Sequence, residues 1–412
     1  MYRTTLPNGL EILVIPNPTV DIVSTRFFFK SGSRQEPKPG VAHLLSALLT
    51  KGTEQYSSME LAHKVESIGA MLGADSNPDY TIVFTKSLSE DFPELLDLTA
   101  QLLYEATFPE EQLELERKNT LQSIRSQQER PFTVAYNQFR TALYGDHPYA
   151  YSDLGTEESV NSITREDLVT FYKTYFRPDN AVFVVVGPVE PKQVVALAEK
   201  LLSHWSAPET PIIVRSLLKE LIAHPVTLRE VQPTQQSTVL VGYEAVAIAS
   251  PDFPVLKLIG TYLGSGLSSR LFTELREKRG LAYEVSAFFP TRVDTSHFVT
   301  YIGTAPENAA TCEEGLQSET QRLCDLLLSD EELRVAKNKL IGQHALGKQT
   351  NSQIAQLVGT YEAIGVGADF DKTYIQAVEA VTREAIQSVA QSTFRNPIIS
   401  LVGPEEVAKM DN

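Results

Sequence analysis

The sequence contains little cysteine and no long apolar segment. Cys312 and Cys324 are its only cysteines among 412 residues, which is too few for a disulfide framework and favours a reducing compartment. No run of ~18 apolar residues occurs, so no membrane-spanning helix is expected. The first residues also lack the charged and apolar segments of a secretory signal. We therefore predict a cytoplasmic protein with no membrane partner.

Positive charge is in deficit as well. The chain has 36 lysine and arginine residues against 52 aspartate and glutamate residues, a formal net charge of −16. Such a field repels phosphate backbones, which argues against a nucleic-acid partner. The glycine-containing segment that begins at Gly264 does not show Walker spacing, so a nucleotide is not implied either. An excess of acidic residues is typical of a well-solvated surface. The alternative is an acidic surface that attracts basic peptides.

What the sequence does contain is a long internal repeat. The chain is too long for one ordinary core, so two or more domains are expected. The run from Phe176 to Gly187 resembles the run from Phe394 to Gly403, about half the chain away. Each run is predicted to end a helix, turn, and form a strand that closes a domain. The resulting division is an N-terminal domain (1–208), a proline-containing linker (209–220) and a C-terminal domain (221–412).

The order of the predicted elements indicates the fold class. In each half a strand, an amphipathic helix and a capped helix follow one another: 80–88, 91–103 and 108 onward in the first half, and 297–304, 309–327 and 328 onward in the second. Ser329 and Glu332 have the spacing of a capping box at the start of the last helix. Strands and helices do not alternate regularly as in a parallel sheet. We predict an α+β protein of two homologous domains, each a largely antiparallel sheet with helices packed on one face.

A short segment around His43 resembles a metal motif. The run from Gly40 to Thr53 reads Gly-Val-Ala-His-Leu-Leu-Ser-Ala-Leu-Leu-Thr-Lys-Gly-Thr. It is similar to the inverted zinc motif of pitrilysin-type (inverzincin) zinc peptidases, in which Gly-x-Ala-His-x-x-Glu-His precedes an apolar run and Lys-Gly-Thr. In that motif, histidines at i and i+4 of one helix face ligate zinc, and the Glu at i+3 activates a water as general base.

The ligand positions of this motif are degenerate here. His43 remains, but Ser46 stands at the Glu position and Ala47 at the second His position. The resemblance places the third ligand seven residues after Glu116, where the sequence has Ser123. A catalytic zinc needs three protein ligands and an open position, and one imidazole binds the ion too weakly. We predict no metal and no cofactor in this chain; the ordinary role for His43 is that of a histidine packed on a helix face.

A second segment follows the family pattern with few departures. The sequence from Gly264 to Tyr283 resembles the C-terminal signature of the same family. In the family an arginine and a tyrosine seven residues later reach the substrate, and the resemblance maps these to Arg276 and Tyr283. Gly280 is expected to stop a helix in the left-handed conformation, and Gly264 to allow close approach of a substrate or of a packing neighbour. Without the resemblance, Arg276 would complement the helix dipole and Tyr283 would be an ordinary strand residue.

The resemblance covers nearly the whole chain and implies a function. Two-subunit members of the family divide the zinc site and the Arg–Tyr pair between homologous chains. The sequence therefore predicts a non-catalytic subunit, inactive alone, that binds peptide or unfolded protein in a heterodimer with a homologue that carries the zinc. One alternative is a structural or assembly protein with a processing-peptidase-like fold and no role in proteolysis. Another is a peptidase that uses other residues of this chain.

Overall fold

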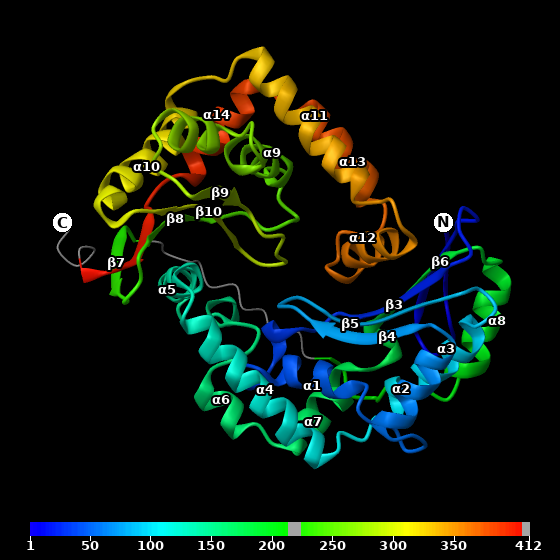
Figure 1. The fold of residues 1–412 in the computed structure, drawn as a ribbon. Coiled ribbons are helices and arrows are strands. Elements are labelled where there is room, and N and C mark those ends of the chain that lie inside the picture. The colour runs from blue at the N-terminus through cyan, green and yellow to red at the C-terminus, as the bar shows by residue number, and fades with distance from the viewer. Residues whose placement is uncertain (213–223, 406–412) are drawn as a thin grey trace. The chain divides into compact units, whose positions relative to one another are not determined.

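The chain forms two compact units, each built around one sheet. The structure, a computed structural model, describes residues 1–212 and 224–405 (Figure 1). Unit 1 comprises residues 1–124, 151–212 and 346–371, and unit 2 comprises residues 125–150, 224–345 and 372–405. The predicted domains, 1–208 and 221–412, are continuous in sequence, whereas each unit takes segments from both. Of the predicted linker, residues 213–220 lie outside the described part of the chain.

Unit 1 is built on a six-stranded sheet in the order β1-β2-β6-β3-β5-β4. Its strands are β1 (Tyr2–Thr5), β2 (Glu11–Pro16), β3 (Val23–Phe29), β4 (Met71–Ser76), β5 (Thr81–Ser87) and β6 (Ala181–Gly187). Only β2 and β6 run parallel among these neighbours; the other pairs are antiparallel. Every residue of β6 is buried, so both faces of the sheet centre are covered.

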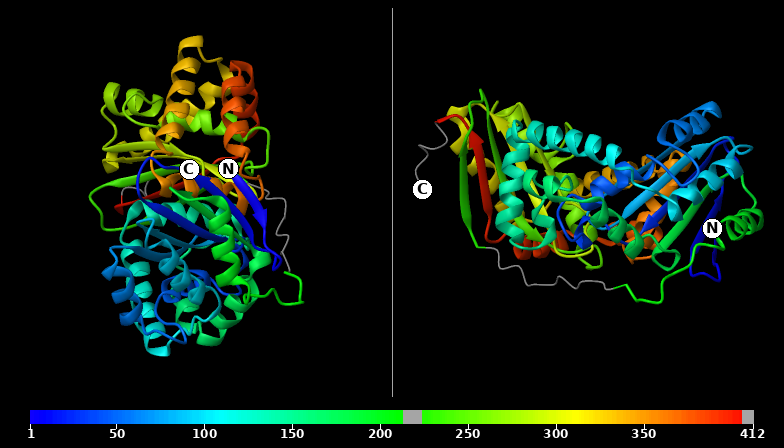
Figure 2. Two further views of the ribbon diagram at one scale, coloured as in Figure 1. Left: turned by 90° about the vertical axis from the view of Figure 1, so that its right-hand side faces the viewer. Right: turned by 90° about the horizontal axis from the view of Figure 1, so that it is seen from below.

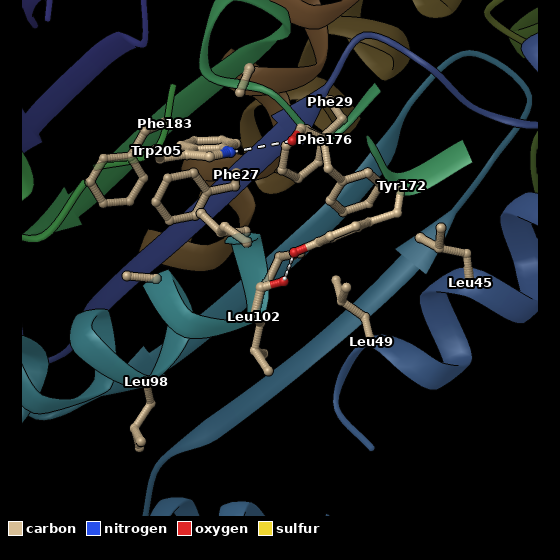
Figure 3. Packing of buried hydrophobic residues seen from close by; sticks show 14 of the residues in the cluster. Phe27, Phe29, Leu45, Leu49, Leu98, Leu102, Tyr172, Phe176, Phe183 and Trp205 are labelled. Carbon is tan, nitrogen blue, oxygen red and sulfur yellow. Dashed lines mark hydrogen bonds between the residues drawn. The ribbon is translucent and has the colours of Figure 1, made fainter. Parts of the chain in front are cut away.

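One face of this sheet carries the main core of unit 1 (Figure 3). The helices on this side are α1 (Val41–Leu49), α2 (Ser58–Ser67), α3 (Phe92–Tyr104), α4 (Glu110–Gln128), α6 (Glu157–Ser162), α7 (Arg165–Tyr175) and α8 (Pro191–Leu202). Phe27 of β3 stacks on Phe183 of β6 with ring centroids 4.1 Å apart, and Phe29 stacks on Phe176 at 3.9 Å. Stacked aromatic rings bury large apolar areas. The first pair joins two neighbouring strands, and the second joins the sheet to the end of α7.

The opposite face of the same sheet is covered by α12 (Asn351–Ala363), a helix from the second half of the chain (Figure 1). Gly359 lies on the ring of Phe28, where an added Cβ would come within 2.0 Å of a ring carbon. The Asn351 amide donates to the carbonyl of Ile22 at 2.7 Å. Glycine at this position therefore lets the helix backbone approach the sheet closely.

Unit 2 repeats the sheet without a counterpart of β1 among its described residues. The order is β7-β11-β8-β10-β9, which matches β2-β6-β3-β5-β4 of unit 1 strand for strand. The strands are β7 (Val226–Val231), β8 (Ser237–Ala245), β9 (Glu284–Phe288), β10 (Ser296–Thr304) and β11 (Ile398–Gly403). Again one pair is parallel, β7 with β11, which lie side by side in Figure 2. This correspondence is what a duplicated unit produces.

Helices also cover both faces of the second sheet. Besides α12, the α-helices of the second half are α9 (Phe253–Gly264), α10 (Ala309–Asp325), α11 (Asp330–Leu346), α13 (Phe370–Ala380) and α14 (Arg383–Thr393). Helices α10 and α14 pack on one face of the sheet. The other face is covered by α5 (Pro131–Tyr144), a helix from the first half of the chain. The close contact in unit 2 is between Phe139 of α5 and Gly242 of β8, where an added Cβ would come within 2.1 Å of the ring. The ring is thus on the helix and the glycine on the strand, the reverse of the contact in unit 1. Each unit thus has one helix from the opposite half of the sequence.

The structure confirms the predicted fold class of two largely antiparallel sheets with packed helices. Phe176 and Phe394 end α7 and α14, and each repeat continues into a buried closing strand. The capping box of α11 is also present, with the Ser329 amide 2.8 Å from the Glu332 carboxylate. The helix on the second face of each sheet is an addition to the prediction. Among the described residues, no helix is both long and apolar enough to span a bilayer.

Candidate functional site

Helix α1 carries the degenerate metal motif and is anchored at its first turn. Gly40 precedes it with a φ of +97°, a left-handed conformation that favours glycine. The two side-chain oxygens of Glu36 accept the Gly40 and Ala42 N–H groups at 3.0 and 2.9 Å, which satisfies donors that a helix start leaves unpaired. Burial raises the pKa of Glu36 to about 8. The start of α1 is therefore stabilised by hydrogen bonds from its own N–H groups to the nearby Glu36 side chain.

The two changed positions on α1 are occupied by side chains that cannot replace the lost ligands. Ser46 is buried, and its hydroxyl donates to the carbonyl of His43 at 2.8 Å, within the same helix. Ala47 has no donor atom. Neither side chain therefore offers an imidazole or a carboxylate that could bind a metal ion.

The third predicted ligand position, Ser123, lies on α4, and its side chain is also hydrogen-bonded within its own helix. The exposed Ser123 hydroxyl donates to the Asn119 carbonyl at 3.0 Å. About two turns earlier on the same helix, a Glu116 carboxylate oxygen lies 3.1 Å from the Lys51 ammonium, so this carboxylate already has a cationic partner. The Lys51–Glu116 pair links the segment that follows α1 to α4. The sequence interpretation missed this ion pair, since its partners are far apart in the chain.

The electrostatics around His43 favour a neutral imidazole. Burial lowers its pKa, and the nearby carboxylates Asp75, Asp153 and Glu116 oppose this shift only in part. Within residues 1–212 and 224–405, no group of three or more histidine, cysteine, aspartate or glutamate side chains is placed to hold a metal ion. A zinc site of three protein ligands therefore does not fit the residues present.

The second candidate segment lies in unit 2 and ends as the sequence predicts. Gly280 has a φ of +63°, its N–H donates to the Arg276 carbonyl at 3.1 Å, and the next N–H donates to the Leu275 carbonyl at 2.9 Å. These bonds close the preceding helix as a left-handed stop does. The helix itself, Phe272–Lys278, differs from the expected α-helix because it is wound as a π-helix. The sequence contains no feature by which we can explain the wider winding.

Arg276 and Tyr283 both present their polar groups to solvent. The Tyr283 side chain is 61% exposed, and its backbone N–H donates to Gly303 at 2.9 Å where β9 begins. The Arg276 guanidinium lies 4.9 Å above the ring of Phe272. Across the described residues, neither the guanidinium nor the Tyr283 hydroxyl has a hydrogen-bond partner in the protein. These two donors are therefore available to a ligand.

Gly264, at the start of the signature, has a packing role in the fold. A Cβ added there would lie 1.9 Å from the backbone nitrogen of Ala287 in β9. The end of α9 thus approaches β9 more closely than any side chain would allow. Of the two roles considered for Gly264, the structure supports that of close packing within the protein.

The degenerate metal positions and the Arg–Tyr pair belong to different units. His43, Ser46, Ala47 and Ser123 lie in unit 1, and Arg276 and Tyr283 lie in unit 2. Phe272, the ring beneath Arg276, was missed by the sequence interpretation. Its spacing of four residues from Arg276 is the signal that could have indicated a contact on one helix face.

Two family models together match most of the chain. Residues 11–157 match a model described as insulinase (peptidase family M16), and residues 162–340 match a model described as the peptidase M16 inactive domain. An uncharacterized zinc protease of Streptomyces coelicolor is 27% identical over 409 residues, 98% of this chain and 89% of that protein. The uncharacterized zinc protease YmxG of Bacillus subtilis is 27% identical over 406 residues, 98% of each chain.

Solved structures share the fold along nearly the whole chain. A protease from Helicobacter pylori superposes with a TM-score of 0.92 at 23% identity, covering 98% of this chain and 99% of that one. A peptidase M16 inactive domain from Pseudomonas fluorescens gives a TM-score of 0.90 at 23% identity, covering 98% of each chain. At this level of identity the likeness concerns the fold alone.

Proposed function

Because the chain belongs to peptidase family M16 but its described residues offer no ligand set for zinc, we propose that it is the non-catalytic, substrate-binding subunit of a two-chain metallopeptidase. The family membership confirms the resemblance on which the sequence interpretation relied. The proposed partner is a homologous chain that holds the zinc, and this chain adds Arg276 and Tyr283 to the site where peptide is bound.

The observation that carries this proposal is that two hydrogen-bond donors of the signature are not used by the fold. Other polar groups of the region are engaged: Arg270 bonds Glu319 at 2.8 Å, and Tyr301 bonds Glu284 at 2.7 Å. Arg276 and Tyr283, by contrast, have exposed polar groups without a partner in the described protein. A ligand that accepts hydrogen bonds would satisfy both.

The chemistry of these two groups suits stabilisation of a developing negative charge. A guanidinium and a phenol hydroxyl both donate to a peptide carbonyl oxygen, which becomes negative as the carbonyl is attacked. Removing one such donor commonly costs ~3 kcal/mol of transition-state stabilisation. Neither group is a nucleophile or base at neutral pH, so the proposal assigns bond cleavage to the partner chain.

Reconstitution with a zinc-bearing homologue from the same organism tests the proposal. We expect the pair to cleave internally quenched peptides and each chain alone to be inactive. Arg276→Ala should lower kcat/KM of the pair by about a hundredfold, as expected for an oxyanion donor. Tyr283→Phe should also lower it, whereas Arg334→Ala, on an exposed arginine of α11, should not.

The outcome against the proposal is equally defined. Unchanged turnover with both Arg276→Ala and Tyr283→Phe would reject the assigned roles. Co-purification with membrane or assembly subunits, without a zinc-bearing homologue, would favour the alternative of a structural protein.

A further inference from the structure

The turn that carries Arg276 is held firmly by its neighbours. Leu275 is buried and packs against Gly315 of α10, where a Cβ would come within 2.8 Å of the leucine side chain. Arg270 bonds Glu319 of the same helix at 2.8 Å. Glu274 lies 2.9 Å from Arg270 and 2.8 Å from Lys278, each four residues away. The backbone of this π-helical turn is thus fixed on the side that faces α10.

Among the described residues, the Arg276 guanidinium has one specific contact, with the ring of Phe272. Leu271 and Leu275 occupy the buried side of the turn, and Phe272 and Arg276, also four residues apart, lie elsewhere on its circumference. The guanidinium carbon is 4.9 Å from the Phe272 ring centroid, the distance of a cation–π contact. Within residues 224–405, Arg276 makes no ion pair or side-chain hydrogen bond. Its position therefore depends on the ring.

We infer that Phe272 is a positioning residue for Arg276: its ring holds the guanidinium so that the N–H groups remain free for a peptide carbonyl. An arginine side chain has several rotatable bonds, and ordering them on binding costs affinity. A guanidinium already resting on a ring loses less of this freedom, and stacking leaves its in-plane donors open. The catalytic consequence rests on the proposed function, but the positioning itself is a property of the free chain.

Nuclear magnetic resonance of the chain alone tests the positioning. In protein labelled at arginine, the Arg276 Nε–H signal is identified by its loss in Arg276→Lys. We expect it to be shifted by the ring current and to move to the position of a mobile arginine in Phe272→Leu. Phe272→Tyr, which keeps a ring, should preserve the shift. An Arg276 signal that is the same in wild type and Phe272→Leu would overturn the inference.

A second arginine–ring pair provides the matched control. Arg26 lies 5.6 Å from the Phe84 ring centroid but also donates to the Ser352 carbonyl at 3.1 Å. Because this hydrogen bond holds Arg26 independently, Phe84→Leu should leave the Arg26 side chain ordered. The same substitution thus releases one arginine and not the other, which separates positioning from a general loss of packing.

The assembled peptidase tests the consequence for the reaction. Phe272→Leu should lower kcat/KM by about two- to fivefold, the factor expected from an exposed cation–π contact, with Phe272→Tyr close to wild type. In the Arg276→Ala background Phe272→Leu should have no further effect, since the ring acts through the guanidinium. An equal loss in both backgrounds would show that Phe272 acts in another way. If Arg276→Ala itself leaves turnover unchanged, the role proposed for Arg276 in the reaction fails, and the resonance experiment still decides the positioning.

Discussion

At the scale of single residues, the positions that the resemblance maps to metal ligands bond within the helices that contain them. Ser46 and Ser123 each donate to a carbonyl of their own helix, and Ala47 contributes only its methyl group. The Lys51–Glu116 pair is separate from all three. Because these interactions are local, the ligands can be restored without removing a long-range contact.

We expect the triple variant Ser46→Glu, Ala47→His, Ser123→Glu to bind one zinc per chain. Together with His43 it restores two imidazoles and a carboxylate, the ligand count that a catalytic zinc requires. Ser46 is buried, so the larger glutamate should lower the melting temperature of the metal-free variant, and zinc should raise it again. Elemental analysis after dialysis measures the metal. Adding His43→Ala should abolish binding, and a triple variant that stays free of metal would show that the positions are mapped wrongly.

A second residue with a defined role is His297, which bonds α5 to the second sheet. Its Nε2 lies 2.7 Å from the Tyr136 hydroxyl and its Nδ1 lies 2.7 Å from the Tyr144 hydroxyl. Tyr144 also donates to the Thr295 carbonyl, so the network is satisfied when Nδ1 carries the proton and Nε2 accepts from Tyr136. The ring is buried, and burial lowers its pKa well below the usual value, with Arg292 and Arg140 acting in the same direction.

This environment predicts a loss of stability in acid. The folded state keeps His297 neutral, whereas the unfolded chain binds a proton below its ordinary pKa of about 6.5. The free energy of unfolding should therefore be fully retained above that pH and decrease below it, by up to about 1.4 kcal/mol per pH unit for one proton. Urea unfolding at pH 7.5, 6 and 5 measures the slope. His297→Gln should flatten it and the exposed His63→Gln should not; equal slopes in wild type and His297→Gln would contradict the assignment.

At the scale of secondary-structure elements, α5 and α12 each pack on a sheet through a contact between an aromatic ring and a glycine. In unit 1 the glycine is on the helix, Gly359 against Phe28, and in unit 2 it is on the strand, Gly242 against Phe139. Both arrangements allow the helix and the strand to approach closely at the glycine. A methyl group at either glycine has no space unless the ring moves.

We expect Gly359→Ala to destabilise the protein by about 1–3 kcal/mol, the usual cost of overpacking a core. The added Cβ would lie 2.0 Å from the Phe28 ring, which is itself fully buried. Gly342→Ala in α11 is the matched control, since it also lies within a helix but its Cβ would meet no atom within 4 Å. That change should stabilise the protein by up to about 1 kcal/mol. Denaturant unfolding measures both, and a neutral Gly359→Ala would show that the helix can shift at no cost.

The elements that sequence reasoning located correctly are those with local signals. The strand runs, the Ser329–Glu332 capping box, the Gly280 stop and the two Phe-Arg repeats depend on residues close together in the chain. The docking of α5 and α12 was missed, because Gly359 and Phe28 are far apart in sequence and a glycine inside a helix gives no indication of which ring it meets.

The candidate site was predictable to the same extent. Spacing alone marks Ser46, Ala47 and Ser123 as candidate ligand positions, and a signature marks Arg276 and Tyr283 as candidate contacts to substrate; these roles remain predictions. The Lys51–Glu116 pair and the winding of Phe272–Lys278 depend on tertiary packing, which the spacing does not encode.

At the scale of the whole molecule, the chain passes between its two units five times. Unit 1 contains residues 346–371 of the second half, and unit 2 contains residues 125–150 of the first. Each exchanged segment covers an apolar sheet face. In unit 1 that face consists of buried side chains from four strands: Leu13, Phe28, Ile82, Val182, Val184 and Val186. Neither half of the sequence therefore contains all the parts of a unit.

This connectivity predicts how the protein responds to being cut. A chain carrying a protease site between residues 212 and 224 should, once cleaved, still elute as one species in size-exclusion chromatography, because each unit keeps segments of both fragments. The fragments should separate only in denaturant. Residues 1–208 made alone should bind a hydrophobic dye and aggregate, since α12 is then missing from the sheet face that contains Phe28. Making the two halves together should restore soluble protein. Two halves that separate in native buffer, each folded and monomeric, would mean that α5 and α12 contribute little to holding the sheets they cover.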